Sequence, residues 1–443
     1  MRTKYNIRYI LLISFISAIG GYLFGFDFAV ISGALPFLKV QFGLDAYWEG
    51  FTTGCLALGC IAGCLFAGQL SEKRGRKVAL MSAGTIFALS SLAMAFSPSL
   101  LIFIIARFAA GIGVGMASML SPMYIAEVSP AVLRGRMVAL NQLTIVIGIL
   151  ITNLVNYILG DQGADSWRWM FGYGLIPSAL FCVGVLFLPE SPRWLVKVGK
   201  PDKAKHVLSL IGNDHFANET LSTIQHAVSQ ETKLDLRLAF KKPFIAAVLV
   251  GIVLATFQQF CGINVVFNYS TTIFESMGFN QNDQLMQTVF IGVVNLFFTL
   301  VALVLVDKLG RKPLMLIGAA GLAIVYIFLT QFLNGDSSVS TTLLLSAIAL
   351  YASTIAPVTW VLISEIFPSM VRSEATTIAV VGLWAAYFIL TFTFPLLAQA
   401  MGGIANTFYV YAGICVVAAV FIWRRVKESK GVALEDMDAV FSH

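Results

Sequence analysis

The stretch LSEKRGRK at residues 70–77 recurs as LVDKLGRK at residues 305–312, which is 235 positions further along the chain. A second stretch, IAEVSPAVLRG at 125–135, recurs as ISEIFPSMVRS at 363–373, with an offset of 238. Glu190 recurs as Glu428 with the same offset of 238. Nearly constant spacing over three unrelated motifs indicates that one unit has been duplicated in the same orientation along the chain.

Both copies are filled by long apolar runs. Apolar residues make up 58% of the 443 positions, charged residues only 12%, and the mean hydropathy is +0.84. Soluble proteins carry about 25% charged residues, so this chain has too little charge to cover a soluble surface. A membrane-spanning helix needs ~20 apolar residues and satisfies its own backbone hydrogen bonds. The runs show no alternation of period two, which favours helices over strands.

We therefore predict an all-α polytopic membrane protein with twelve transmembrane helices in two six-helix halves. The predicted spans are 8–36, 50–71, 77–96, 100–128, 134–160, 168–189, 240–275, 284–307, 313–333, 341–367, 372–400 and 405–426. Two parallel six-helix repeats are the plan of the major facilitator fold, in which the substrate site lies midway between the repeats.

Four parts follow from these spans. They are an N-terminal half (1–189), a linker (190–239), a C-terminal half (240–426) and a tail (427–443). The linker is polar, but Ala204, Val207, Leu208 and Ile211 share one helical face, so we expect short amphipathic helices there.

The net charge of +6 is spread over many short loops, which does not favour nucleic-acid binding. If the N-terminus is cytoplasmic, only Lys39 and Arg168 fall in outer loops, and nearly all other bases face the cytoplasm. This asymmetry follows the positive-inside rule. We expect a monomeric protein of the cell membrane, with lipid as its solvent and both termini in the cytoplasm.

Several kinds of catalytic chemistry have no support in the sequence. All four histidines lie in the central linker or the tail, and all six cysteines lie in apolar segments, where packing is their ordinary role. Neither paired carboxylates nor a Ser–His–Asp set lies in the spans. The stretch GIGVG at 111–115 sits inside an apolar helix and follows no strand, which favours close helix packing over nucleotide binding. We expect no enzyme activity, no metal and no cofactor.

The repeated loops each place an acid ahead of a glycine and two bases on the cytoplasmic side. One interpretation is plain positive-inside charge. The other is a set of ion pairs that biases one conformational state, since several exposed pairs of ~0–1 kcal/mol each add up. We name this candidate set the cytoplasmic latch. Its members are Glu72, Arg76, Glu127, Arg134, Glu190, Arg193, Asp307, Arg311, Glu365 and Arg372.

Polar residues inside a membrane are costly and usually face a cavity. The seventh span contains FQQFCGINVVFNYS, in which Gln258, Gln259, Asn264 and Asn268 surround Gly262. Their spacing exceeds one helix face, so we predict a break near the glycine. Amides both donate and accept hydrogen bonds, which suits a ligand rich in hydroxyls. For each amide alone, interhelical packing is an equally good explanation.

The motifs GGYLFGFDFAVISGAL, EKRGRK, PESPRWL, FQQFCGINVVFNYS, VDKLGRKPL and PVTWVLISEIFP, in this order, resemble the sugar porter family of the major facilitator superfamily. The resemblance is in particular to the bacterial xylose–proton symporters of this family, and it covers nearly the whole chain. It implies that Gln142, Asn295 and Trp360 contact sugar together with the amides of the seventh span, and that Phe24 and Trp384 line the same cavity. The candidate sugar-binding residues are thus Phe24, Gln142, Gln258, Gln259, Asn264, Asn268, Asn295, Trp360 and Trp384.

The chain departs from the family pattern at four places. Leu383 stands where the family has an amide before the tryptophan of the eleventh span. Ile355–Ala356 replaces a Trp–Gly pair of the tenth span. Asn268 replaces the cavity tyrosine of the seventh span, and Ser373 follows Arg372 where glycine is usual. The first three changes lie near the expected site, so the resemblance does not identify the sugar. With fewer aromatic side chains from the tenth span, the cavity suits a different or larger sugar than xylose.

Asp27 is the only acid deep in the predicted bundle, and Arg107 in the fourth span is the only deep base. The resemblance implies that they face each other. We interpret them as the proton-coupling pair: Asp27 takes a proton from outside and releases Arg107, sugar binds, and the proton leaves inside. The alternative is a structural ion pair.

The predicted function is therefore proton-coupled symport of a monosaccharide, a hexose or a pentose, by alternating access. A facilitative uniporter in which Asp27 is structural is the main alternative. An efflux pump for apolar compounds would not need the amides of the seventh span. A sugar sensor without transport would need a longer cytoplasmic tail than residues 427–443 provide.

Overall fold

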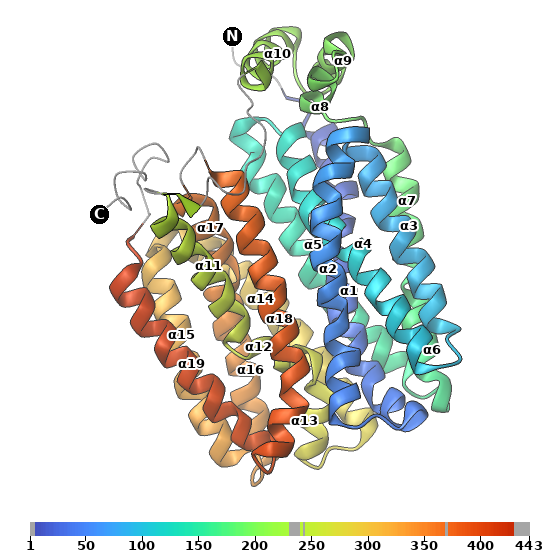
Figure 1. Ribbon diagram of the computed structural model, residues 1–443, viewed down its shortest axis with the longest axis vertical. Helices are drawn as coiled ribbons and strands as arrows, with labels where there is room; N and C mark the ends of the chain where they lie inside the picture. Colours follow the sequence, from blue (N-terminus) through green and yellow to red (C-terminus); the bar gives the residue numbers. More distant parts are fainter. Residues whose placement is uncertain (1–4, 230–239, 242–243, 368–370, 429–443) are drawn as a thin grey trace. The chain divides into compact units, whose positions relative to one another are not determined.

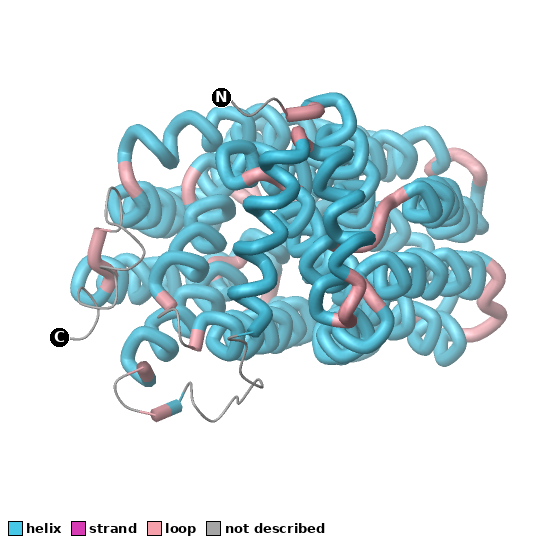
Figure 2. The backbone as a smooth tube through the Cα atoms, turned by 90° about the horizontal axis from the view of Figure 1, so that it is seen from above, coloured by secondary structure: helices cyan, strands magenta, loops and turns pink. Residues whose placement is uncertain are grey.

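The computed structural model describes residues 5–229, 240–241, 244–367 and 371–428. Helices make up most of this part of the chain, which contains no strand (Figure 2). Twelve helical stretches in it have the length and apolar composition to cross a membrane. The prediction of an all-α membrane protein with twelve spans is confirmed.

Breaks within spans raise the number of helices above twelve (Figure 1). The first six spans are formed by α1 (Ile7–Phe42), α2 (Ala46–Arg74), α3 (Arg76–Ala95), α4 (Leu100–Val128), α5 (Ala131–Leu159), and α6 (Ser166–Tyr173) with α7 (Leu175–Phe187). The last six are formed by α11 (Ile245–Phe260) with α12 (Ile263–Asn268) and α13 (Ser270–Ser276), α14 (Gln281–Leu309), α15 (Arg311–Phe332), α16 (Ser337–Ser353) with α17 (Ile355–Ile366), α18 (Arg372–Ala400) and α19 (Ile404–Arg425).

The linker contains three short helices, α8 (Pro192–Lys197), α9 (Pro201–Ile211) and α10 (Asp214–Ser229). The apolar face predicted for the first part of the linker is buried: Ala204 and Leu208 of α9 are at most 2% exposed. Helix α9 lies where the sequence predicts a short amphipathic helix. Residues 230–239 of the predicted linker and 429–443 of the predicted tail lie outside the described ranges.

Internal contacts divide the chain into two compact units. Unit 1 comprises residues 1–27, 59–149 and 168–233, and unit 2 comprises residues 28–58, 150–167 and 234–443. The predicted boundaries of the two halves, the linker and the tail stay predictions.

In unit 1, helices α2 and α4 touch backbone to backbone. A Cβ atom on Gly115 would lie 2.3 Å from the carbonyl oxygen of Cys60, and one on Gly59 would lie 2.0 Å from that of Phe108. Only glycine fits such an approach, as the small-residue interpretation of GIGVG requires. The tight contact fixes the height of α4 on α2, and with it the position of Arg107 one turn before Gly111.

In unit 2, the seventh span is broken where the sequence predicts it. Helix α11 ends at Phe260, and Gly262 adopts a left-handed conformation with φ of +84° before α12 begins. A side chain at this position would also collide with Tyr411, because a Cβ atom would lie 2.6 Å from its Cγ. Glycine is therefore required both for the backbone angle and for the space.

Prolines in two helical segments of unit 2 leave carbonyl oxygens without their usual helical donors, because proline has no N–H group. Pro36 frees the carbonyl of Ser32 in α1, which accepts a hydrogen bond of 2.7 Å from the Thr271 hydroxyl. Pro395 frees the carbonyl of Thr391 in α18, which accepts one of 2.7 Å from the Tyr269 hydroxyl. With its carbonyl satisfied, α1 continues through Pro36 to Phe42, beyond the predicted end at residue 36.

A third contact of this group joins the same two segments of α1 and the seventh span. The hydroxyls of Ser32 and Ser270 lie 2.6 Å apart, and both residues are buried.

The geometry at Gly262 predicts the result of adding one methyl group. We expect Gly262→Ala to lower stability by about 1–3 kcal/mol, because alanine at this φ is strained and its Cβ meets Tyr411. The thermal unfolding midpoint in detergent measures the loss. Gly413→Ala is the matched control, since nothing lies within 4 Å of a Cβ there. Equal midpoints for the two variants would contradict the required left-handed turn.

Candidate functional site

The buried ion pair of unit 1 joins α1 and α4. Arg107 Nη1 lies 3.4 Å from Asp27 Oδ1, and Arg107 Nη2 lies 3.4 Å from Asp27 Oδ2. Both side chains are 0% exposed. The structure thus brings together the two residues predicted to couple protons.

The distance between the Arg107 nitrogens and the Asp27 oxygens shows how tightly the two side chains are paired. Charge-assisted hydrogen bonds between nitrogen and oxygen usually measure about 2.7–2.9 Å, so 3.4 Å is a loose pairing. Removing one partner of a buried pair leaves an uncompensated charge, which is costly. Protonation of Asp27 would neutralise the carboxylate in place and remove the negative charge that faces Arg107. The pair is chemically suited to binding and releasing one proton.

Two candidate sugar-binding residues belong to unit 1. Phe24 on α1 and Gln142 on α5 are both half-buried. Their helices pack closely, since a Cβ atom on Gly25 would lie 2.0 Å from the carbonyl oxygen of Ile145. The Gln142 amide makes no hydrogen bond to the described residues, so its donors and acceptor remain available.

The other seven candidates belong to unit 2, and five of them form one cluster. A chain of amides runs along the broken seventh span: Asn264 Nδ2 donates to Gln259 Oε1, and Gln259 Nε2 donates to Gln258 Oε1 at 3.4 Å. All three side chains are at most 6% exposed. The break at Gly262 makes this possible, because it turns residues from different helix faces toward one another.

Asn268 ends α12 and is fully buried. Its Nδ2 donates to the carbonyl of Asn264 and to the hydroxyl of Tyr387, both at 2.8 Å. Trp384 lies one turn before Tyr387 on α18, is 3% exposed, and packs with its ring 5.8 Å from that of Tyr387. These contacts place Asn268 and Trp384 beside the amide chain.

The two remaining candidates differ from the cluster. Asn295 on α14 is 5% exposed, and its amide makes no hydrogen bond within the described part of the chain. Trp360 on α17 is 43% exposed, the largest exposure among the candidates of unit 2. Leu383 and Ile355, which depart from the family pattern, are both 4% exposed.

Sequence reasoning missed one tyrosine of this region. The hydroxyl of Tyr387 accepts a hydrogen bond from Asn268. A tyrosine in an apolar helix is read as packing, so it did not stand out. The available signal was the spacing of Tyr387, three residues after Trp384 and hence on the same helix face.

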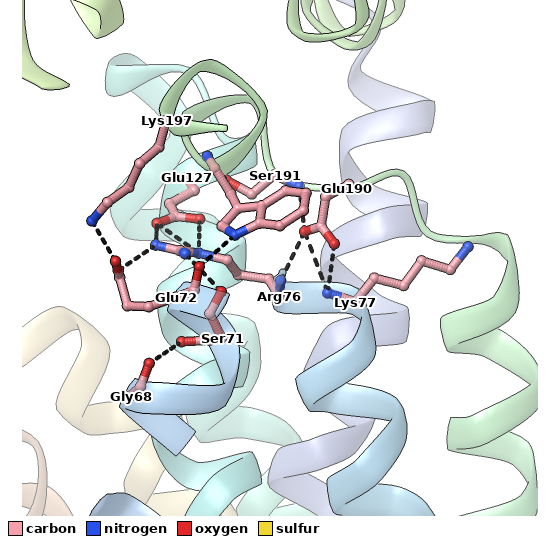
Figure 3. A network of polar contacts seen from close by, with 10 residues as sticks. Gly68, Ser71, Glu72, Arg76, Lys77, Glu127, Glu190, Ser191 and Lys197 are labelled. Atoms are coloured by element: carbon pink, nitrogen blue, oxygen red, sulfur yellow. Dashed lines mark hydrogen bonds and ion pairs between the residues drawn. The ribbon is translucent and has the colours of Figure 1, made fainter. Parts of the chain in front are cut away.

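Part of the cytoplasmic latch is an ion-pair network within unit 1 (Figure 3). Arg76, the first residue of α3, donates from Nη2 to Glu127 Oε1 at 2.9 Å and from Nε to Glu127 Oε2 at 3.0 Å. Glu72 lies 3.7 Å from Arg76 Nη2 and also pairs with Lys197 of α8. The bidentate Arg76–Glu127 pair is only 5% and 10% exposed, which makes it stronger than a surface pair.

Glu190 has a role that the sequence did not predict. Its carboxylate accepts hydrogen bonds from the backbone N–H groups of Arg76 at 2.9 Å, Lys77 at 3.2 Å and Ser191 at 2.8 Å (Figure 3). It therefore caps the N-terminus of α3, where an anion is favoured. Partial burial raises the pKa of Glu190, against the opposing effect of these N–H donors and of the nearby Arg76 charge.

Unit 2 repeats this cap. Glu428 accepts hydrogen bonds from the backbone N–H groups of Arg311 at 2.9 Å and Lys312 at 3.1 Å, at the start of α15. The glycines before the two helices, Gly75 and Gly310, have φ of +95° and +90°. The motif shared by the two copies is thus a helix start capped by a carboxylate from the end of its own copy.

The remaining latch residues are placed only in part. Arg134 donates from Nε to the carbonyl of Ala126 at 3.1 Å, and Arg193 lies in α8. Arg311 donates from Nη1 to the carbonyl of Val306 at 3.4 Å. The side chains of Asp307, Glu365 and Arg372 lie outside the described part of the structure. Their role in the latch stays a prediction.

These features define a class of protein: a polytopic membrane transporter of the major facilitator fold, duplicated in sequence, with an amide-rich cluster and a buried ion pair. The family model of the sugar (and other) transporter family matches residues 13–441. The chain belongs to this family.

Individual relatives are similar over nearly their whole length. The arabinose-proton symporter of Bacillus subtilis is 36% identical, with 99% of this chain and 96% of the relative covered. The D-xylose-proton symporter of Escherichia coli is 36% identical, with 100% and 97% covered. An inward-open structure of the xylose transporter XylE from E. coli matches with a TM-score of 0.86 at 34% identity, covering 98% of this chain and all of that one.

The cap at Glu190 predicts a loss of stability when the carboxylate is removed. We expect Glu190→Ala to destabilise the protein by about 1–2 kcal/mol, since α3 loses its capping acceptor, and Glu190→Gln to cost less because one oxygen remains. The unfolding midpoint in detergent reports both. Glu219→Ala is the control, because Glu219 is 73% exposed on α10. If Glu190→Ala behaved like this control, the cap would contribute nothing.

Proposed function

We propose that the protein is a proton-coupled symporter that carries a monosaccharide, a hexose or a pentose, by alternating access. The observation that carries the proposal is the fully buried Asp27–Arg107 pair, in a family whose relatives include an arabinose-proton and a xylose-proton symporter. A carboxylate with no exposure to solvent and a loosely placed partner is a site for one transferable proton.

The amide cluster supports a sugar as the co-transported substrate. Gln258, Gln259 and Asn264 offer donors and acceptors within a few residues of the helix break, and Trp384 offers an apolar ring beside them. Hydroxyls of a sugar pair with amides, and the C–H face of a pyranose packs on an aromatic ring. The half-buried Gln142 and Phe24 are further candidates for contacts with the same ligand.

The proposed cycle begins with Asp27 accepting a proton from outside and separating from Arg107. Sugar binds, the two six-helix halves exchange access, and the proton and sugar leave on the cytoplasmic side. Asp27 and Arg107 then pair again. The membrane potential supplies ~2.3 kcal/mol per charge per 100 mV, which corresponds to more than tenfold accumulation of sugar.

The cytoplasmic latch fits this cycle as a bias on the conformational equilibrium. States that differ by a few kcal/mol respond to a network of ion pairs of this size. Arg76, Glu127 and Glu72 supply such a network at the ends of α2, α3 and α4. We place the protein, as a monomer, in the cell membrane with both termini in the cytoplasm.

Asp27 provides the decisive test of coupling. In proteoliposomes with an inward proton gradient, we expect the wild type to accumulate radiolabelled glucose, xylose, galactose or fructose. Asp27→Asn should still exchange the sugar but not concentrate it, because the neutral amide cannot carry the proton.

Asp336→Asn is the matched control for this test. Asp336 caps α16 by accepting from Ser338 N at 2.9 Å and Val339 N at 3.1 Å, and asparagine caps equally well. Accumulation should therefore persist. If the wild type and Asp27→Asn both merely equilibrate the sugar, the protein is a uniporter and Asp27 is structural.

Asn295 tests the sugar site separately from the proton site. Its amide has no hydrogen bond to the described residues, so Asn295→Ala should raise the KM for sugar about tenfold with little change in the unfolding midpoint. Asn153 is equally buried, but its Nδ2 donates to the carbonyl of Thr288 at 2.7 Å. Asn153→Ala should lower the midpoint and leave KM nearly unchanged. The reverse pattern would remove Asn295 from the sugar site.

A further inference from the structure

Tyr387 is a buried tyrosine that binds an amide of the seventh span. It lies in α18, is 1% exposed, and its hydroxyl accepts a hydrogen bond of 2.8 Å from Asn268 Nδ2. Asn268 stands where the family pattern has a cavity tyrosine on the seventh span. The hydrogen bond thus joins the seventh span to α18.

The orientation of the Asn268 amide is fixed by its surroundings. Its Nδ2 group has two hydrogens, and both are used, one by the carbonyl of Asn264 and one by the Tyr387 hydroxyl. A flipped amide would turn Oδ1 against the Asn264 carbonyl, where two acceptors would repel. The Oδ1 atom is therefore held on the opposite side, where no described residue donates a hydrogen bond to it.

The Tyr387 ring is held as firmly as its hydroxyl. Its centroid lies 5.8 Å from that of Trp384 at an interplanar angle of 75°, and 5.0 Å from that of Phe28 at 44°. Both contacts are of the tilted or edge-on kind that aromatic pairs prefer. Tyr387 thus connects the candidate sugar-facing ring of Trp384 with the amide of Asn268.

We propose that Tyr387 is a positioning residue that determines the sugar specificity of this transporter, an inference that rests on the proposed function. It fixes Asn268 Oδ1 as an acceptor, so the site requires a sugar hydroxyl that donates at that point. An acceptor of fixed direction rejects a substrate that lacks the matching donor, because a buried oxygen is then left unpaired.

The test uses analogues of the sugar that the wild type transports fastest among glucose, xylose, galactose and arabinose. Replacing each hydroxyl in turn by hydrogen or fluorine removes one donor at a time, and KM for uptake into proteoliposomes is measured for each analogue. In the wild type, we expect one position at which both replacements raise KM about tenfold. In Tyr387→Phe, the penalty at that position should shrink to about twofold, with the others unchanged.

Tyr269→Phe is the matched control. Tyr269 is also fully buried, but its hydroxyl donates to the carbonyl of Thr391 and not to an amide of the cluster. This variant should lose stability yet keep the wild-type pattern of penalties. In Asn268→Ala, the rise in KM at that one hydroxyl position should disappear as it does in Tyr387→Phe. The double variant should show no further change in KM.

The possible outcomes separate the two hypotheses. If the wild type moves no sugar, the proposed function is wrong. If the wild type moves sugar and Tyr387→Phe keeps every penalty, or weakens all analogues equally, Tyr387 is only a packing residue and the inference fails.

Discussion

The bilayer offers no water to a backbone group that has lost its helical partner, and this constraint governs where the helices of this protein can break. Pro36 and Pro395 each free a carbonyl, and in both cases a hydroxyl from the start of α13 replaces the missing donor. The break at Gly262 serves a different purpose, since it turns the amides of α11 and α12 toward one another. Irregular backbone occurs in unit 2 where side chains nearby can satisfy it or make use of it.

The same constraint explains how charge and polarity are distributed within the spans. Asp27 and Arg107 are each other's counter-ion at 0% exposure, so neither can change its charge without affecting the other. Gln258, Gln259 and Asn264 of the seventh span hydrogen-bond to one another, which satisfies part of their hydrogen-bonding capacity inside the span. In both arrangements, polar groups within the spans are partnered by other polar groups of the same unit.

Local patterns in the sequence predicted much of this architecture. Twelve apolar runs, the duplicated motifs, the break at Gly262 and the Asp27–Arg107 pair all follow from composition, spacing or family resemblance. Contacts between distant residues did not. Tyr269 and Thr391 are 122 positions apart, and Glu190 caps a helix start 114 positions before it. Nothing in the local sequence of Pro395 or Arg76 identifies these partners, and Tyr387 has no local feature that distinguishes it from a packing residue.

The contact between Ser32 and Ser270 joins two residues of the same kind. Their buried hydroxyls are 2.6 Å apart. Two like residues that meet must be self-complementary, as in the interface of a symmetric dimer. Serine qualifies because its hydroxyl both donates and accepts, whereas two lysines or two ionised acids would repel.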